Sequence, residues 1–227
     1  MLRVSVLENS PPMSYRDANG ELTGFTFGVI RAVCEEMRVV CKYQPTTIDR
    51  VLAEVAADEV DIAAVSLLDT PERRAALIFA KPYFRSISLW FAKPGVQPGQ
   101  AGIRIAVVRG SAQDRYVLAK GWEAVGVRTN GELAEPLLAG VAQAAVVPMS
   151  TGLNLMKRED FRKMGLVSTV MHEPELGGDA SFGISPRRPE LKEQVDAMLD
   201  RIKRNGVYDR INSQFCLSGS TDGCANS

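Results

Sequence analysis

The most informative segment of this chain is Thr70-Pro71-Glu72-Arg73-Arg74, together with Lys81-Pro82-Tyr83-Phe84, which begins eleven residues after Thr70. The first stretch closes a βαβαβ unit, and an extended apolar run to Phe91 follows the second. Taken alone, residues 70–74 are typical of a helix start with a surface arginine paired to a neighbouring carboxylate. The segments on either side decide whether Arg73 has another role.

Short apolar strands alternate with amphipathic helices, which predicts an α/β fold with largely parallel sheets. The first unit has predicted strands at 2–7, 39–43 and 61–65 and predicted helices at 25–37 and 48–57. The second unit begins with a strand at 103–108 and continues through helices at 112–120 and 132–138, strands near 125, at 144–147 and at 166–171, and a helix near 153.

A segment rich in proline and glycine, Lys93-Pro94-Gly95-Val96-Gln97-Pro98-Gly99, separates the two units and predicts a lobe boundary. We therefore expect one lobe from residues 1–92 plus 184–227 and a second from 93–183, joined by two hinge crossings. Terminal helices at about 189–204 and 207–215 are expected to pack on the first lobe. A hinge between two lobes is suited to trapping a small solute.

The composition is that of a soluble globular protein, with 227 residues, 45% hydrophobic and 24% charged. The formal net charge is zero, so no basic field attracts nucleic acid or an anionic membrane. The apolar runs are too short for a spanning helix. A strand follows Met1 directly, so we expect that any export signal peptide has been removed.

Four cysteines form two local pairs, Cys34 with Cys41 and Cys216 with Cys224. An even number in local pairs suggests two disulfides and an oxidising compartment, and four unrelated buried thiols are the alternative. A metal site is disfavoured because the chain has no Cys-x-x-Cys spacing and a single histidine, His172, which we interpret as a solvated loop residue.

Four sequence blocks in order resemble those of the bacterial extracellular solute-binding proteins of family 3, which deliver amino acids and related solutes to ABC transporters. The blocks are Pro11-Pro12-Met13, Gly20 to Gly24-Phe25, the Thr70 to Arg73 stretch, and residues 79–83. The resemblance implies a two-lobe type II periplasmic-binding-protein fold. It also favours a Cys34–Cys41 disulfide, because several basic-amino-acid binders of the family have a cystine at that place.

The resemblance implies that Arg73 clamps a ligand carboxylate, a task suited to the planar fork of a guanidinium. Ser111, in the turn Arg109-Gly110-Ser111-Ala112, matches the family's Gly-[Ser/Thr] turn in the second lobe. Free N–H groups at the start of the following helix attract negative charge. Ser66, in the segment before the Thr70 stretch, is a further candidate ligand contact.

Several positions depart from the family pattern. Ser10 stands where a covering aromatic is usual, Met13 where phenylalanine is frequent, and Leu68 where serine or threonine is frequent. Pro148 occupies the place of the aspartate that binds the ligand's ammonium group. Among possible replacement acids Glu8 is best placed, at the end of the first strand, although a solvated surface charge is its plainer interpretation.

We therefore expect a monomeric, periplasmic or extracellular binding protein, without cofactor or metal, that presents a small carboxylate-bearing solute to a membrane permease. One alternative is the extracytoplasmic sensor domain of a histidine kinase or other receptor. Another is an enzyme similar to the cyclohexadienyl dehydratases of this fold, which needs an acid in a dry cleft. Glu8 is the strongest candidate for that acid.

Overall fold

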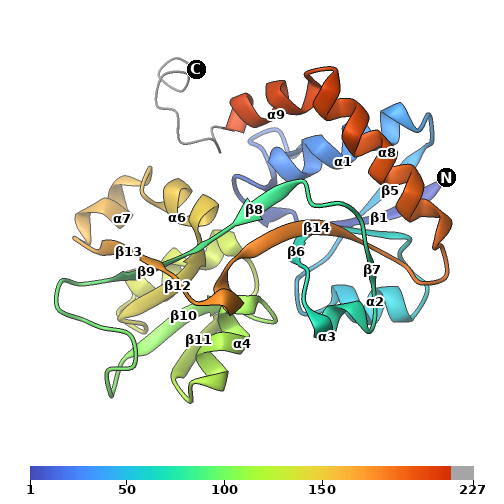
Figure 1. Cartoon of the computed structure of the whole chain (residues 1–227). Coiled ribbons are helices and arrows are strands. Elements are labelled where there is room, and N and C mark those ends of the chain that lie inside the picture. Colours follow the sequence, from blue (N-terminus) through green and yellow to red (C-terminus); the bar gives the residue numbers. More distant parts are fainter. Residues whose placement is uncertain (216–227) are drawn as a thin grey trace.

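The computed structural model describes residues 1–215 and contains two α/β lobes (Figure 1). The 6-stranded sheet of the first lobe has the order β5-β1-β6-β14-β7, with β8 paired to β14. Its strands are β1 (Leu2–Val6), β5 (Cys41–Pro45), β6 (Ile62–Leu68), β7 (Ile78–Phe79), β8 (Phe84–Ser86) and β14 (Gly178–Ile184).

The 5-stranded sheet of the second lobe has the order β11-β10-β12-β9-β13. Its strands are β9 (Ser88–Ala92), β10 (Arg104–Val108), β11 (Glu123–Val127), β12 (Ala144–Pro148) and β13 (Val167–Met171). Helices of this lobe are α4 (Ala112–Ala119), α5 (Ala134–Leu138), α6 (Met149–Leu155) and α7 (Glu159–Lys163), with the 3-10 turns η1 (Asn130–Glu132) and η2 (Pro174–Leu176).

Helices α1 (Phe25–Glu36), α8 (Glu190–Arg204) and α9 (Val207–Phe215) lie together on the first lobe (Figure 1). Their apolar faces contribute Ile30, Val33, Leu199 and Ile202 to a core that includes β1 and β14. The first lobe also contains α2 (Val51–Ala56), α3 (Pro71–Arg74) and a 3-stranded sheet of β2 (Asn9–Ser10), β3 (Ser14–Arg16) and β4 (Leu22–Thr23).

Both sheets are mixed, which refines the prediction of largely parallel sheets. β1 pairs in parallel with β5 and β6, and β10 pairs in parallel with β11 and β12, as expected for βαβ units. β14 and β9 instead run antiparallel to their neighbours. These two strands follow the crossings between lobes, where the chain enters a sheet as an extended segment and not through a crossover helix.

The strand pairing differs from the predicted lobe boundaries at both crossings. Residues 88–92 form β9 inside the second sheet, and residues 178–183 belong to β14 inside the first sheet. The segment Lys93–Gly99 is a loop after β9, within the second lobe. We therefore propose that the lobes meet at Ile87 and Gly177, where β8 and β14 pair side by side.

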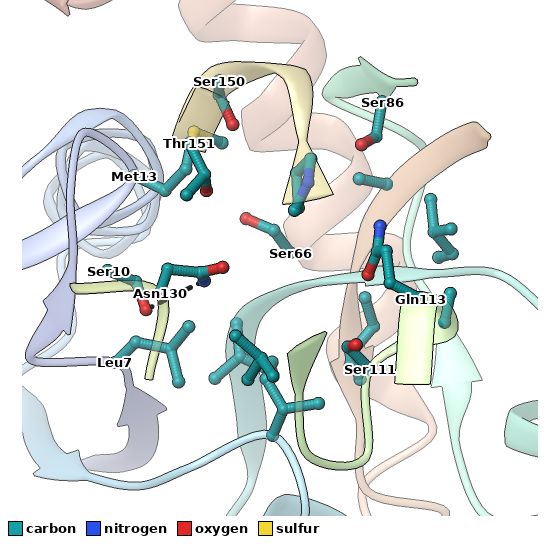
Figure 2. A pocket seen from close by; sticks show the side chains of 18 of the residues that line it. Leu7, Ser10, Met13, Ser66, Ser86, Ser111, Gln113, Asn130, Ser150 and Thr151 are labelled. Atoms are coloured by element: carbon teal, nitrogen blue, oxygen red, sulfur yellow. Dashed lines mark hydrogen bonds between the residues drawn. The ribbon is translucent and has the colours of Figure 1, made fainter. Parts of the chain in front are cut away.

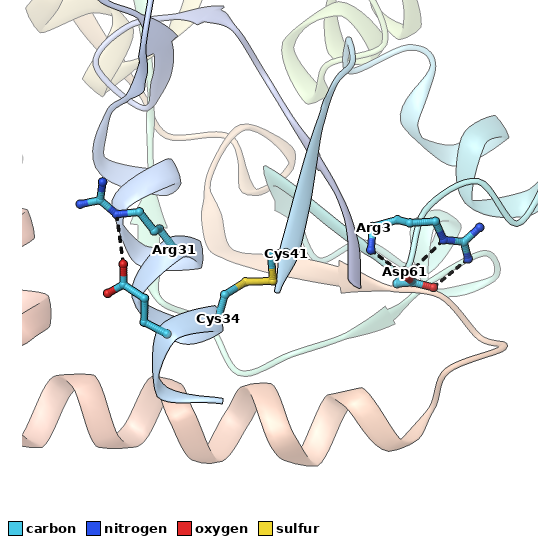
Figure 3. Close-up of a disulfide and its surroundings, with 6 residues drawn as sticks. Arg3, Arg31, Cys34, Cys41 and Asp61 are labelled. Carbon is cyan, nitrogen blue, oxygen red and sulfur yellow. Dashed lines mark hydrogen bonds and ion pairs between the residues drawn. A yellow bond between two sulfur atoms is a disulfide. The ribbon is translucent and has the colours of Figure 1, made fainter. Parts of the chain in front are cut away.

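The Cys34–Cys41 disulfide is present and joins α1 to the start of β5 (Figure 3). Cys216 and Cys224 lie outside the described residues, so their predicted pairing stays a prediction. Among the helices within residues 1–215, none combines the length and apolar character needed to cross a membrane.

Candidate functional site

A cavity lies between the two sheets and takes side chains from both lobes (Figure 2). The first lobe contributes Leu7, Ser10, Met13, Ile48, Val65, Ser66, Leu67, Leu68, Arg73, Phe84, Ser86 and Ala180. The second lobe contributes Val108, Ser111, Ala112, Gln113, Asn130, Pro148, Ser150 and Thr151. Most second-lobe residues follow the carboxyl ends of parallel strands, where ligands of open α/β sheets bind.

An irregularity in β6 forms one wall of the cavity. The register against β14 shifts between Ser181 and Gly183, and Ser66 has a φ of 55°, a left-handed conformation that is uncommon for serine. The Ser66 hydroxyl contacts the Thr26 hydroxyl at 2.6 Å and the Tyr83 hydroxyl at 2.7 Å. Burial raises the pKa of Tyr83 to about 12. The protonated phenol therefore helps to hold this strained segment at the cavity.

Arg73 is positioned by α3, and the residues at the start of this helix are typical helix-start residues. Pro71 stands at the helix start, and the Thr70 side chain accepts a hydrogen bond from the Arg73 backbone N–H. The Arg73 side chain turns inward, with the residue only 4% exposed. Its Nη1 donates to the Leu68 carbonyl at 3.0 Å, and its Nη2 lies 3.5 Å from the Gly110 carbonyl of the other lobe.

Arg73 has no ion-pair partner among the residues of the described structure. Desolvation, followed by the charge of Arg115, lowers its pKa to about 10, so the side chain stays protonated at neutral pH. Arg74 differs completely, because it is exposed and its Nε binds Asp69 at 2.6 Å. The two neighbouring arginines therefore differ in both burial and partners.

Ser111 and Gly110 form the facing wall on the second lobe. The Ser111 hydroxyl accepts from the Asp114 backbone N–H at 3.1 Å and caps α4. Gly110 has a φ of 72°, and a Cβ there would lie 2.8 Å from the Asp49 Cα of the first lobe. Glycine is required twice here, for its conformation and for the close approach of the lobes.

The predicted contacts Ser10, Met13, Ser66 and Leu68 line the cavity, as do Arg73, Ser111 and Pro148. Glu8 does not. Its carboxylate is exposed and binds Arg16 at 2.9 Å, because the β2 to β3 turn directs it outward. Asp69 and Asp179 are likewise paired, with Arg74 and Arg85. These acids therefore do not replace the missing aspartate in this conformation.

The cavity contains one charged side chain, that of Arg73, among hydroxyl, amide and apolar groups. No Asp, Glu or His of the described chain lines it. His172 lies in a separate surface hollow beside Glu173. Within residues 1–215 no cluster of His, Cys, Asp and Glu has an arrangement that fits a metal ion. The arrangement is suited to holding an anion beside an uncharged polar group.

Sequence reasoning missed four polar residues of the second lobe, Gln113, Asn130, Ser150 and Thr151. Gln113 is 5% exposed, and its Nε2 donates to the Ser88 hydroxyl at 2.9 Å. Their common signal is position, since each follows the end of a parallel strand by a few residues. Position after a parallel strand therefore predicts which edge of the sheet a residue occupies, but not whether its side chain points into the cavity.

These features define a two-lobe α/β protein with a cavity between its lobes. The family model for bacterial extracellular solute-binding proteins, family 3, matches residues 2–218, and the chain belongs to that family.

Two curated relatives are similar over most of their length. The L-arginine-binding protein of Pseudomonas aeruginosa is 27% identical, over 94% of this chain and 87% of the relative. The lysine/arginine/ornithine-binding periplasmic protein of Escherichia coli is 25% identical, over 94% and 86%. Both are named as binding proteins.

Solved structures show the same fold. An ancestral arginine-binding protein bound to arginine superposes with a TM-score of 0.82 at 22% identity, covering 94% of this chain and 97% of that one. The ancestral amino acid-binding protein AncCDT-1, described as a precursor of cyclohexadienyl dehydratase, gives 0.80 at 22% identity, covering 94% of each. The predicted family and fold class are confirmed.

Proposed function

We propose that this protein captures a small carboxylate-bearing solute outside the cytoplasm and presents it, with closed lobes, to an ABC transporter permease. The observation that carries the proposal is Arg73, a buried cation with no ion-pair partner within residues 1–215. An unpaired buried charge is costly, so a site that retains one is arranged for an anionic ligand.

The ligand carboxylate lies between Arg73 and the Gly110-Ser111 turn in this proposal. Arg73 keeps N–H groups beyond those bound to the Leu68 and Gly110 carbonyls, since a guanidinium has five donors. The N-terminal end of α4 faces the same space and adds backbone donors with a favourable dipole. Both lobes thus contribute to one anion subsite.

The rest of the solute carries no ammonium group in this proposal. Pro148 offers neither a carboxylate nor an N–H, Leu68 is apolar, and Glu8 is directed away from the cavity. An ammonium group buried without a carboxylate partner would cost several kcal/mol, about the difference between micromolar binding and none. We therefore infer a preference for hydroxy, keto or dicarboxylic acids over the basic amino acids named for the relatives.

Binding is favoured over catalysis for the same chemical reason. Dehydration of a prephenate-like acid needs a proton donor for the leaving hydroxyl. The cavity residues of the described chain include hydroxyl and amide groups but no carboxylic acid or imidazole. Relatives named as binding proteins support the same choice.

Calorimetry with the wild-type protein and a panel of solutes tests the proposal. The panel contains L-arginine, L-lysine, L-glutamate and a series of hydroxy, keto and dicarboxylic acids. We expect one of the acids lacking an amino group to bind with micromolar or lower Kd. Tight binding of L-arginine or L-lysine by the wild type would contradict the assignment of a solute without an ammonium group.

Pro148→Asp, compared with Pro148→Asn, isolates the amine subsite. The aspartate restores an acid at the cavity wall, so the variant is expected to gain affinity for an α-amino acid of the panel and to lose affinity for the preferred acid. Asn has nearly the same size without the charge. Equal behaviour of the two variants would show that charge at residue 148 does not set the choice of ligand.

A further inference from the structure

The two lobes touch beside the cavity through β2 of the first lobe and the start of η1 in the second. Asn9 donates from Nδ2 to the Thr129 hydroxyl at 2.9 Å. Asn130 donates from Nδ2 to the Ser10 hydroxyl at 3.1 Å. Each bond joins residues 120 positions apart in sequence, so neither can form unless the lobes are closed.

The contact is close enough that a methyl group at residue 131 would displace the Asn9 side chain. A Cβ built on Gly131 would lie 2.1 Å from the Asn9 Oδ1 and 2.6 Å from its Cγ. Gly131 is not among the glycines with positive φ, so its backbone conformation is open to other residues. A side chain at residue 131 would therefore disturb the interlobe contact of Asn9 without straining the local backbone.

The same contact belongs to the cavity wall. Ser10 and Asn130 both line the cavity, and Ser10 is 1% exposed. Figure 2 shows the Asn130 amide nitrogen directed at Ser10 and its oxygen directed toward the middle of the cavity. Asn9 and Thr129 lie outside the cavity lining. The Ser10–Asn130 pair thus lines the cavity, whereas the Asn9–Thr129 pair only connects the two lobes.

We propose that Asn9, Ser10, Thr129 and Asn130 form an interlobe latch that populates the closed form before any solute binds. Asn130 couples this latch to the cavity, because it holds Ser10 through its nitrogen and offers its oxygen to a donor on the solute. The coupling to a solute rests on the proposed function, whereas the latch itself does not. A ligand then shifts an existing equilibrium between open and closed forms.

Small-angle X-ray scattering of the ligand-free protein tests the latch without knowledge of the solute. The protein is unfolded in guanidinium chloride without reductant, to remove any co-purified solute, and then refolded. Asn9→Ala removes one interlobe hydrogen bond, which shifts the ratio of closed to open forms by roughly two- to tenfold. The radius of gyration is expected to increase accordingly.

Gly131→Ala is also expected to shift the equilibrium toward the open form, because its methyl group meets the Asn9 side chain. Asn9→Ala removes that obstacle, so the double variant should scatter like Asn9→Ala alone. Asn19→Ala is the matched control, an exposed asparagine in the same lobe, and should scatter like the wild type. Circular dichroism checks that every variant is folded.

A scattering profile unchanged in both Asn9→Ala and Gly131→Ala would overturn the latch, as would a double variant more open than Asn9→Ala. These outcomes are independent of the calorimetric panel. A failed panel with a responsive latch rejects the proposed ligand class, and a successful panel with an unresponsive latch rejects this inference alone.

Discussion

The role of the Arg73 side chain depends on its surroundings. Its neighbour Arg74 has the same chemistry, yet Arg74 forms a surface ion pair with Asp69 while Arg73 is buried beside two carbonyl groups. A surface ion pair contributes little to stability. A buried guanidinium without an ion-pair partner is costly, and in the proposed function it binds the carboxylate of the solute.

Arg73→Ala is therefore expected to abolish solute binding and to leave the fold intact. Removing one partner of a desolvated charge pair costs about 2–5 kcal/mol of affinity, which is roughly thirtyfold or more. Arg74→Ala, the matched control, should change the Kd little. Titration calorimetry of both variants with the preferred acid checks this, and similar Kd values for the two would show that the carboxylate is bound elsewhere.

At the residue scale, the sequence motifs predict Ser10, Met13 and Leu68 as ligand contacts, and all three line the cavity because the motif spacing fixes their backbone positions. Glu8 was harder, since the residues at the end of a strand alternate in direction and a two-residue strand, β2, turns it outward to Arg16. Asn130 was missed because nothing in its local sequence distinguishes an inward amide from an exposed one.

Two element-level contacts hold the first sheet, and Figure 3 shows both. The Cys34–Cys41 disulfide ties the last turn of α1 to β5. We expect Cys34→Ser with Cys41→Ser to lower the free energy of unfolding by about 2–3 kcal/mol, because the bridge closes a short loop in the unfolded chain. Urea unfolding without reductant measures the loss. An unchanged midpoint would show that native strain cancels the benefit.

Arg3 joins β1 to Asp61, which immediately precedes β6. The Arg3 Nη2 lies 2.8 Å from the Asp61 carboxylate, and the Arg3 backbone N–H donates to the same group at 2.8 Å. Burial alone would raise the pKa of Asp61, but the hydrogen bonds and charge of Arg3 outweigh it and lower that pKa below its ordinary value. The folded state therefore stabilises the charged form of the Asp61 carboxylate relative to the unfolded state.

Stability from this pair is complete above the ordinary aspartate pKa and is lost as pH falls through the lowered value. Urea midpoints at pH 7, 4.5 and 3 are expected to fall most steeply below pH 4 in the wild type. Asp61→Asn should flatten that fall, whereas Glu35→Gln, at an exposed pair with Arg31 of 3.7 Å, should not. Parallel curves for wild type and Asp61→Asn would contradict the assignment.

The strands that the sequence pattern misplaced are those at the crossings. In Ser88–Ala92 an apolar run follows the serine and all five residues are buried, so the pattern fits either sheet equally well. Only pairing with β12 and β13 decides its lobe. The short strands β2, β3, β7 and β8 have two or three residues each, too few for any periodic signal.

At the scale of the whole molecule, the lobes have separate apolar cores, and the cavity is lined from both. A solute bound as proposed would bridge two bodies that otherwise meet at the crossings, at the latch, at the small apolar cluster of Leu68, Ala112 and Ala180, and at contacts such as Glu72 with Arg115. A ligand that binds only the folded, closed form at about a hundred times its Kd adds roughly 2.7 kcal/mol to stability.

Because the bound solute would contact both lobes, it should stabilise both lobes against local unfolding. Hydrogen exchange with the preferred acid is expected to slow at the end of β6 in the first lobe and at the start of α4 in the second, by similar factors. In Arg73→Ala both effects should disappear together, and in Arg74→Ala both should remain. Slower exchange in one lobe alone would mean that the solute binds without closing the lobes, and the proposed presentation of a closed form to a permease would then lose its physical basis.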